Sequence, residues 1–183
     1  MGRNNMRIGV SRWLIIFIFF GRLFATSLIP ASIEEMTRRS SLILTGVVRS
    51  ISISENPDNG MIFRTIEIEP DWVLKGEIRK GQTVYIYALG GKLKGMTMKV
   101  PGAPEFTVGE KVLVFLKKDR QNRWRVFGMA EGKFSLVDTR RGVRAVRALD
   151  EINFVEPKGE RVTFKSEYPF DELIGIVLSQ LRK

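Results

Sequence analysis

The stretch Phe106-Thr-Val-Gly-Glu-Lys-Val-Leu-Val-Phe-Leu116 decides the fold that we expect of this chain. Residues 107–110 have the composition of a turn, and residues 111–116 then form an almost continuous apolar run. So short a run, rich in Val and Phe and ended by Lys117-Lys118-Asp119, is typical of a central strand. The other elements of the chain are therefore arranged around residues 111–116.

Both faces of this expected strand are apolar. Side chains alternate along a strand, so one face carries Val112, Val114 and Leu116, and the other carries Leu113 and Phe115. A strand that is apolar on both sides must be covered twice. We expect the opposite wall of a barrel on one side and a helix on the other.

Composition bounds the chemistry that is available to the protein. The 183 residues, with 44% hydrophobic and 27% charged residues, are those of a globular chain with one domain of ordinary size. The chain has no cysteine and no histidine. It therefore cannot form disulfides, Cys/His zinc sites, Ser-His-Asp triads or a cysteine-linked lipoprotein anchor. We predict no cofactor and no metal.

Residues 1–27 resemble a secretory signal peptide. They combine three early arginines, the apolar run 13–20 and the small residues Ala25-Thr-Ser27 at the spacing of a cleavage site. The apolar run is too short for a membrane-spanning helix, which needs about 20 residues. Because Arg22 interrupts the hydrophobic region, an uncleaved amphiphilic anchor is the alternative.

The mature chain, residues 28–183, is expected to be one exported domain, located in the periplasm or outside the cell. Loss of residues 1–27 removes four arginines and no acidic residue, which lowers the formal charge from +10 to +6. The mature protein is therefore moderately basic.

Alternating apolar residues and turn signals predict a series of strands, at 42–54, 61–74, 83–88, 96–100, 111–116, 123–127, 133–137 and 160–165. Gly46 suggests a bulge or bend in the first strand, and Pro70-Asp71 is expected to interrupt the second. Glu55-Asn-Pro-Asp-Asn-Gly60 has the residues of a tight turn between these two strands.

Helices are expected at the two ends of the mature chain. Ser32-Ile-Glu-Glu35 fits a capping box. Pro169 precedes a run in which apolar residues recur at helical spacing, namely Phe170, Leu173, Ile174, Val177 and Leu181. The fold class that we predict is mainly β: a small OB-like antiparallel barrel with a short N-terminal helix and a closing C-terminal helix.

Three segments resemble the netrin-like and metalloproteinase-inhibitor pattern. They are residues 40–50 (SSLILTGVVRS), 66–76 (IEIEPDWVLKG) and 108–116 (VGEKVLVFL). The resemblance implies a netrin-like barrel of OB type in an exported protein, with an exported protease as a possible partner. Those inhibitors act through an N-terminal cysteine, which this chain lacks, so inhibition by that route does not carry over.

A second set of motifs resembles a family of bacterial exported proteins whose activity is uncharacterised. It comprises Gly90-Gly91, residues 101–106 (PGAPEF), Gly109-Glu110, Phe115-Leu116 and residues 128–134 (GMAEGKF). This resemblance implies the fold and the location only.

The loop that contains Gly90, Gly91, Lys92 and Lys94 is one candidate site. Its backbone amides and ammonium groups could hold an anion, although the spacing is not that of a P-loop. We favour a structural loop that closes the barrel, because glycine in loops usually answers a backbone requirement.

Two basic groups are further candidates for partner or anion contacts. Arg123, Trp124 and Arg125 lie close to Lys117, Lys118 and Arg120, and the second group consists of Arg140, Arg141, Arg144 and Arg147. Basic residues interleaved with an aromatic side chain can bind single-stranded nucleic acid. Nucleic acid is nevertheless an unexpected partner for an exported protein. Solvated surfaces, or weak contacts with an anionic envelope, are the simpler interpretations.

A catalytic centre is not expected. Glu67 and Glu69 lie two apart on one strand face and could act as paired carboxylates, but we favour a solvated strand face, because nothing in the sequence indicates a cleft around them. We therefore predict a non-enzymatic binding or accessory module that interacts with an exported protein. The alternatives are a binder of anionic envelope polymers or lipids, and a hydrolase that works without His and Cys.

Overall fold

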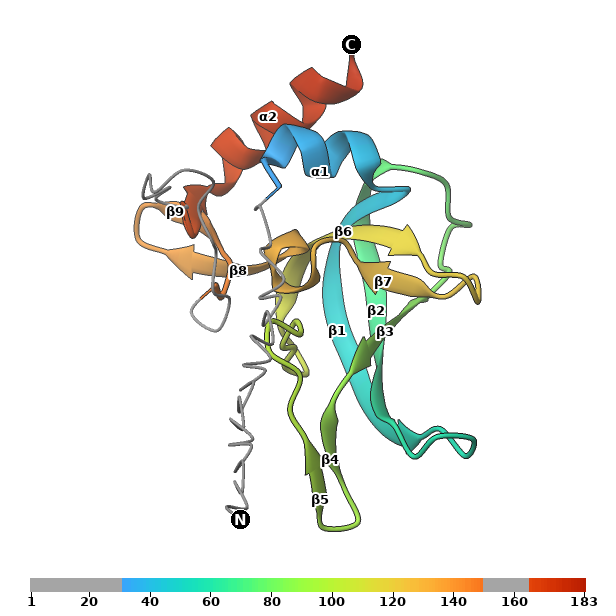
Figure 1. The fold of residues 1–183 in the computed structure, drawn as a ribbon. Helices are drawn as coiled ribbons and strands as arrows, with labels where there is room; N and C mark the ends of the chain where they lie inside the picture. Colours follow the sequence, from blue (N-terminus) through green and yellow to red (C-terminus); the bar gives the residue numbers. More distant parts are fainter. Residues whose placement is uncertain (1–30, 150–164) are drawn as a thin grey trace, which may run out of the picture.

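The computed structural model describes residues 31–149 and 165–183 and shows a mainly β protein (Figure 1). Five strands close into a barrel in the order β1-β2-β3-β7-β6, with β6 pairing back onto β1. They are β1 (Leu42–Glu55), β2 (Ile62–Lys75), β3 (Val84–Leu89), β7 (Trp124–Val126) and β6 (Lys111–Lys118). Neighbours are antiparallel except β3 and β7. The predicted OB-like barrel is confirmed.

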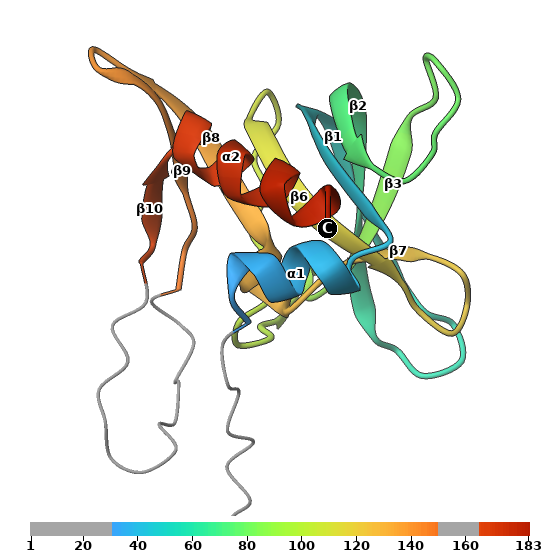
Figure 2. The ribbon, with the colours of Figure 1, turned by 90° about the horizontal axis from the view of Figure 1, so that it is seen from above.

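The central strand β6 is buried on both faces, as its pattern predicts. Val112, Val114 and Leu116 lie inside the barrel with residues of β1, β2 and β3. Leu113 and Phe115 point the other way, into a second core under the helices α1 (Ile33–Arg39) and α2 (Phe170–Leu181). Figure 2 shows both helices crossing over this side of the sheet. Two separate apolar cores therefore meet at one strand.

The sheet continues beyond the barrel through β8 (Lys133–Thr139), β9 (Gly142–Val146) and β10 (Glu167–Pro169). Phe134 and Ala145, from β8 and β9, are buried in the core under the helices. The strand that was predicted at 160–165 lies outside the described residues, apart from Lys165. β10 follows a few residues later and begins the run into α2.

Each helix begins where its sequence predicts. The Ser32 hydroxyl accepts a hydrogen bond from the Glu35 amide at 3.1 Å, which is one half of the capping box. Glu35 itself does not reach back but pairs with Arg39 at 2.6 Å. Pro169 directly precedes α2. Within the part of the chain that the structure describes, neither helix is long and apolar enough to cross a membrane.

The predicted interruption of the second strand at Pro70 is wrong. β2 runs through it, because Pro70 lies opposite Gly46 beside a register shift in β1. Such a bulge tolerates the missing N–H of proline. The strand predicted at 96–100 is present but shorter: β5 (Met96–Met98) pairs with β4 (Gly91–Leu93) in a small separate sheet.

Candidate binding pocket

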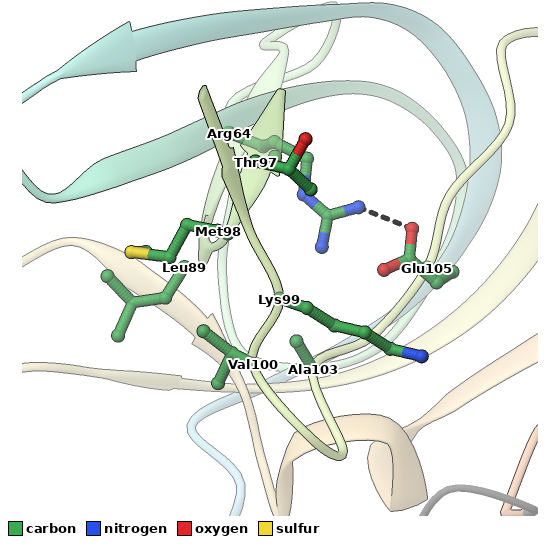
Figure 3. A pocket seen from close by; sticks show the side chains of 10 residues that line it. Arg64, Leu89, Thr97, Met98, Lys99, Val100, Ala103 and Glu105 are labelled. Atoms are coloured by element: carbon green, nitrogen blue, oxygen red, sulfur yellow. Dashed lines mark hydrogen bonds and ion pairs between the residues drawn. The ribbon is translucent and has the colours of Figure 1, made fainter. Parts of the chain in front are cut away.

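A pocket of about 360 Å³ lies where β3 passes into the β4–β5 hairpin (Figure 3). We call it the Arg64 pocket. Its walls come from the end of β3, both strands of the hairpin and the segment 99–105 that follows them. Its volume falls within the range of about 300–1,000 Å³ that is common for ligand pockets.

Two glycines allow the hairpin to fold tightly against the barrel. Gly90 has a φ of +95°, and a Cβ there would lie 2.9 Å from the carbonyl oxygen of Met98. Gly91 packs against the stem of Arg64, whose Cγ would lie 3.5 Å from an added Cβ. Both glycines that the sequence nominates therefore line the pocket, and both have a structural reason to be glycine.

The wall formed by residues 99–105 is held by its own hydrogen bonds. The Ala103 amide donates to the Val100 carbonyl at 3.0 Å, which closes a turn. The Gly102 carbonyl accepts from the Ala130 amide at 2.9 Å, which ties the turn to the short helix η1 (Met129–Gly132). Phe106, the next residue, is buried inside the barrel. The pocket is therefore built before any ligand arrives.

Arg64 is the charged group of this pocket. It lies on β2 in the inward-facing register of Ile62, Ile66 and Ile68, and only 8% of the residue is exposed. Its Nη1 pairs with Glu105 Oε2 at 2.5 Å, and its Nη2 donates to the Pro104 carbonyl at 3.3 Å. Its buried Nε has no hydrogen-bond partner among the described residues.

The ion pair between Arg64 and Glu105 is unequal. The side chain of Arg64 is 10% exposed, whereas that of Glu105 is 76% exposed. A buried guanidinium needs a counter-charge, because it cannot lose its proton and has left water. The exposed carboxylate can return to water at little cost. Glu105 is therefore the exchangeable member of the pair.

A smaller pocket of about 60 Å³ adjoins the Arg64 pocket. The two share Leu89, Val100 and Ala103 in their linings, and the smaller one adds Arg125 and Met129. We call it the Arg125 pocket. The structure thus brings Gly90 and Gly91 of one predicted site and Arg125 of another into one continuous region.

The remaining residues of those predicted sites lie outside both linings. Lys92 is exposed on β4, and Lys94 lies at the tip of the hairpin with its Nζ 4.0 Å from Glu55 Oε2. Trp124 is partly buried against the barrel core, and the Lys118 ammonium lies 5.0 Å from the centre of its ring. Trp124 is therefore a barrel residue and not an open stacking platform.

Arg123 is engaged by its own hairpin. Its Nη2 lies 2.9 Å from Asp119 Oδ2, and its guanidinium lies over the ring of Tyr87. Burial acts to raise the pKa of Asp119, but hydrogen bonds from the backbone and side chain of Arg123, together with its charge, bring that pKa below its ordinary value. Asp119 therefore offsets one positive charge of this basic group, and its carboxylate is shared by Arg123 and Arg125.

The second basic group is on another hairpin, formed by β8 and β9. Arg140 and Arg141 are exposed at its turn, and Arg144 pairs with Glu167 of β10 at 2.6 Å. Arg147 is buried, only 5% exposed, and donates to the Lys165 carbonyl. None of these four arginines lines the Arg64 pocket or the Arg125 pocket.

Sequence reasoning missed all three charged residues that line the pocket, Arg64, Lys99 and Glu105. A signal for Arg64 was present, because the period of two that places Ile62, Ile66 and Ile68 inside also places Arg64 inside. An arginine in a buried register needs a partner and marks a site. Lys99 and Glu105 lie in an irregular segment, where no periodicity in the sequence predicts which way a side chain points.

The described residues contain one serine–lysine arrangement that resembles a catalytic pair. Lys133 Nζ lies 2.8 Å from the Ser135 hydroxyl, but it also pairs with Glu110 Oε1 at 2.5 Å. The Ser135 hydroxyl donates to the same Glu110 oxygen, so its proton is directed at the carboxylate and not at Lys133. Glu110 also accepts from the Thr107 amide, so the cluster fastens the turn before β6 to β8.

The paired carboxylates are likewise part of the sheet surface. Glu67 accepts a hydrogen bond from the Ser50 hydroxyl at 2.6 Å, and Glu69 pairs with Arg49. Both contacts are cross-strand pairs with β1. Within residues 31–149 and 165–183, no cluster of three or more Asp, Glu, His or Cys side chains could hold a metal ion.

Comparison with known proteins does not suggest a function, so the proposed function is based on the pocket. No family model matches the chain, and no curated protein matches its sequence.

Proposed function

We propose that this protein is an exported, non-enzymatic binding module that holds an extended segment of a protein partner in the Arg64 pocket. The adjoining Arg125 pocket takes the next part of the same segment. The observation that carries this proposal is the buried guanidinium at the wall of a preformed pocket, covered by an exposed carboxylate.

The edge of β5 supports a polypeptide as the ligand. β5 pairs only with β4 among the described strands, so one of its two edges is unpaired there. Thr97 and Met98 of this strand line the Arg64 pocket. An extended segment can add to such an edge through main-chain hydrogen bonds while its side chains enter adjoining pockets.

The alternative of an anionic polymer or lipid surface has weaker support. The basic side chains that would serve it are divided between two hairpins, and Arg123 and Arg144 are already paired with carboxylates. Binding through the exposed pair Arg140 and Arg141 would fall steeply with salt. Binding through the Arg64 pocket depends less on salt, because the guanidinium is buried.

Site-specific photocrosslinking tests the proposal. A photoreactive phenylalanine analogue replaces Thr97, which is exposed at the pocket, or Thr139, which is exposed in the β8–β9 hairpin. The full chain carrying either change is produced in cells that export it and is then irradiated. We expect discrete polypeptide adducts from position 97 only.

Two further crosslinking results decide whether the partner binds at the Arg64 pocket. Adducts from position 97 should disappear when Arg64 is replaced by Met in the same chain, because the pocket loses its charged group. Adducts from both positions alike, or from position 139 alone, would show that the partner binds elsewhere. A complete lack of polypeptide adducts would refute the proposal that the pocket binds a protein partner.

A further inference from the structure

We propose that the Arg64 pocket recognises a glutamate side chain of the partner segment, whose carboxylate replaces that of Glu105 on the Arg64 guanidinium. This inference rests on the proposed function and names the chemistry of its ligand. Glu105 occupies the position that the partner takes over.

The donors of Arg64 favour a second carboxylate. A guanidinium carries five N–H donors in one plane. The described structure uses Nη1 for Glu105 and Nη2 for the Pro104 carbonyl, while Nε has no partner. A carboxylate can accept two parallel N–H bonds from such a fork, which is the strongest arrangement available to this pair.

The difference in exposure makes the exchange favourable. Arg64 lies almost fully buried, so its need for a negative partner persists when Glu105 leaves. The Glu105 side chain regains water in the exchange, whereas a bound glutamate would be held between the pocket walls. Figure 3 shows the Glu105 carboxylate facing the guanidinium from the opposite wall.

The walls suit the aliphatic part of a glutamate. Leu89, Met98, Val100 and Ala103 line the pocket beside the single guanidinium. Apolar walls contact the methylene groups of the side chain, while Arg64 takes the carboxylate. A phosphate group carries more charge and usually draws on several cationic or backbone donors. The guanidinium already binds one carboxylate, that of Glu105, and a glutamate side chain of the partner would present the same group.

The charge of the chain assists the encounter. Lys99 also lines the pocket, and Figure 3 shows its side chain extending to the same side as Glu105. The formal charge is +10 for the whole chain and remains +6 without residues 1–27. Acidic segments are therefore attracted to this protein before they reach the pocket.

A pair of capped peptides gives the direct test. The full chain is titrated with Ac-Ala-Glu-Ala-NH2 and, separately, with Ac-Ala-Gln-Ala-NH2, which has the same shape without the charge. The side-chain Nε–H signal of Arg64 is followed by NMR and is assigned from its loss in Arg64→Met. We expect the glutamate peptide alone to move this signal, because Nε gains a hydrogen-bond partner.

Substitution of Glu105 tests the exchange. Glu105→Gln removes the competing carboxylate from an exposed position, so it should tighten binding of the glutamate peptide roughly five- to tenfold if Glu105 normally occupies Arg64 for most of the time. Glu77→Gln removes the same charge at another exposed residue and should leave the affinity unchanged. Arg64→Met should weaken binding more than tenfold.

The remaining outcomes separate this inference from the proposed function. Equal binding of both peptides would overturn the recognition of a carboxylate and leave the Arg64 pocket as a polypeptide-binding site. An unchanged affinity in Glu105→Gln would overturn the exchange. Inorganic phosphate that moves the Arg64 signal at a lower concentration than the glutamate peptide would replace glutamate by phosphate as the ligand group. Polypeptide adducts at position 97 without any peptide binding would overturn this inference alone. If Arg64→Met does not fold, Glu105→Gln still decides.

Discussion

Glu131 is a buried carboxylate whose charge is only partly satisfied. It is 1% exposed, its Oε2 accepts from the Ala31 amide at 3.0 Å, and its Oε1 has no partner among the described residues. Burial raises the pKa of Glu131 above its ordinary value of 4.5, and the Ala31 hydrogen bond and the charge of Arg147 offset only part of that rise. Glu131 therefore titrates at a higher pH in the folded protein than in the unfolded chain.

This pKa shift predicts a pH-dependent effect of Glu131→Gln. Between the unfolded and folded pKa values the folded state binds more protons, so the free energy of unfolding of the wild type falls as pH rises. Glutamine cannot titrate. Relative to Glu131→Gln, the wild type should lose stability as pH rises above 4.5 and should level off above the folded pKa. Urea unfolding from pH 4 to 8 measures this, and a stability difference that does not change with pH would contradict it.

Gly46 shows how closely β1 and β2 approach at the bulge. A Cβ at this position would lie 2.4 Å from the Glu69 carbonyl oxygen and 2.8 Å from Cγ2 of Ile68. Real Cβ atoms do not approach a backbone oxygen so closely, and the oxygen belongs to a paired strand that cannot move freely. The bulge therefore requires glycine here.

Gly46→Ala should lower the free energy of unfolding by roughly 1–3 kcal/mol, through overpacking between the two strands. Gly175 provides the control, because it is exposed in α2 and an added Cβ meets nothing within 4 Å. Gly175→Ala should raise stability by up to about 1 kcal/mol. Chemical denaturation of both variants measures the two effects, and equal stabilities would refute the close approach.

At the scale of elements, Lys75 joins the end of β2 to the C-terminus of α1. Its ammonium donates to the carbonyl of Thr37 at 2.7 Å and to that of Arg38 at 2.9 Å. Those carbonyls belong to the last turn of the helix, where positive charge is favourable. Burial nevertheless lowers the pKa of Lys75. This side chain therefore fastens the C-terminal turn of α1 to the end of β2.

Lys75→Met keeps the length of the side chain and removes the donors. It should destabilise the protein by about 1–2 kcal/mol, the range for charged hydrogen bonds at a helix end. Amide hydrogen exchange should increase in α1 more than in β6, because the loss is local. Lys80→Met, at an exposed turn residue, is the control. Faster exchange spread equally over both elements would contradict the assigned role.

Strands and helices were predictable from the sequence where apolar residues recurred with one clear period. β6 was clear because its two faces are both apolar, and each face has its own core in the structure. β9 was missed because its run of five residues is short, directly follows Arg140 and Arg141, and has only Ala145 buried. The run of β2 through Pro70 was missed because a proline opposite a bulge depends on the partner strand, which a local pattern does not reveal.

The binding pocket was predictable only in part. Gly90 and Gly91 were nominated as an anion loop and do line it, whereas the lysines beside them point elsewhere. The buried charge of the pocket comes from Arg64, which lies 26 positions before Gly90 in the chain and reaches the pocket because β2 pairs with β3. Contacts of this kind depend on the register between strands, which the spacing of motifs in the sequence does not predict.

At the scale of the whole molecule, we expect export followed by cleavage after Ser27. The supporting observations are the arginine-rich start, the apolar run and the small residues at 25–27. N-terminal sequencing of the protein recovered from the envelope or medium should begin at Leu28. A chain that retains Met1 in a membrane fraction would indicate the uncleaved anchor.

The proposed function requires that a partner binds the barrel at the Arg64 pocket. Hydrogen exchange of the full chain, with and without the polypeptide that crosslinks at position 97, measures this directly. We predict slower exchange in β5 and residues 99–105, with the β8–β9 hairpin unchanged. Protection confined to the β8–β9 hairpin, with the Arg64 pocket unaffected, would contradict the central claim.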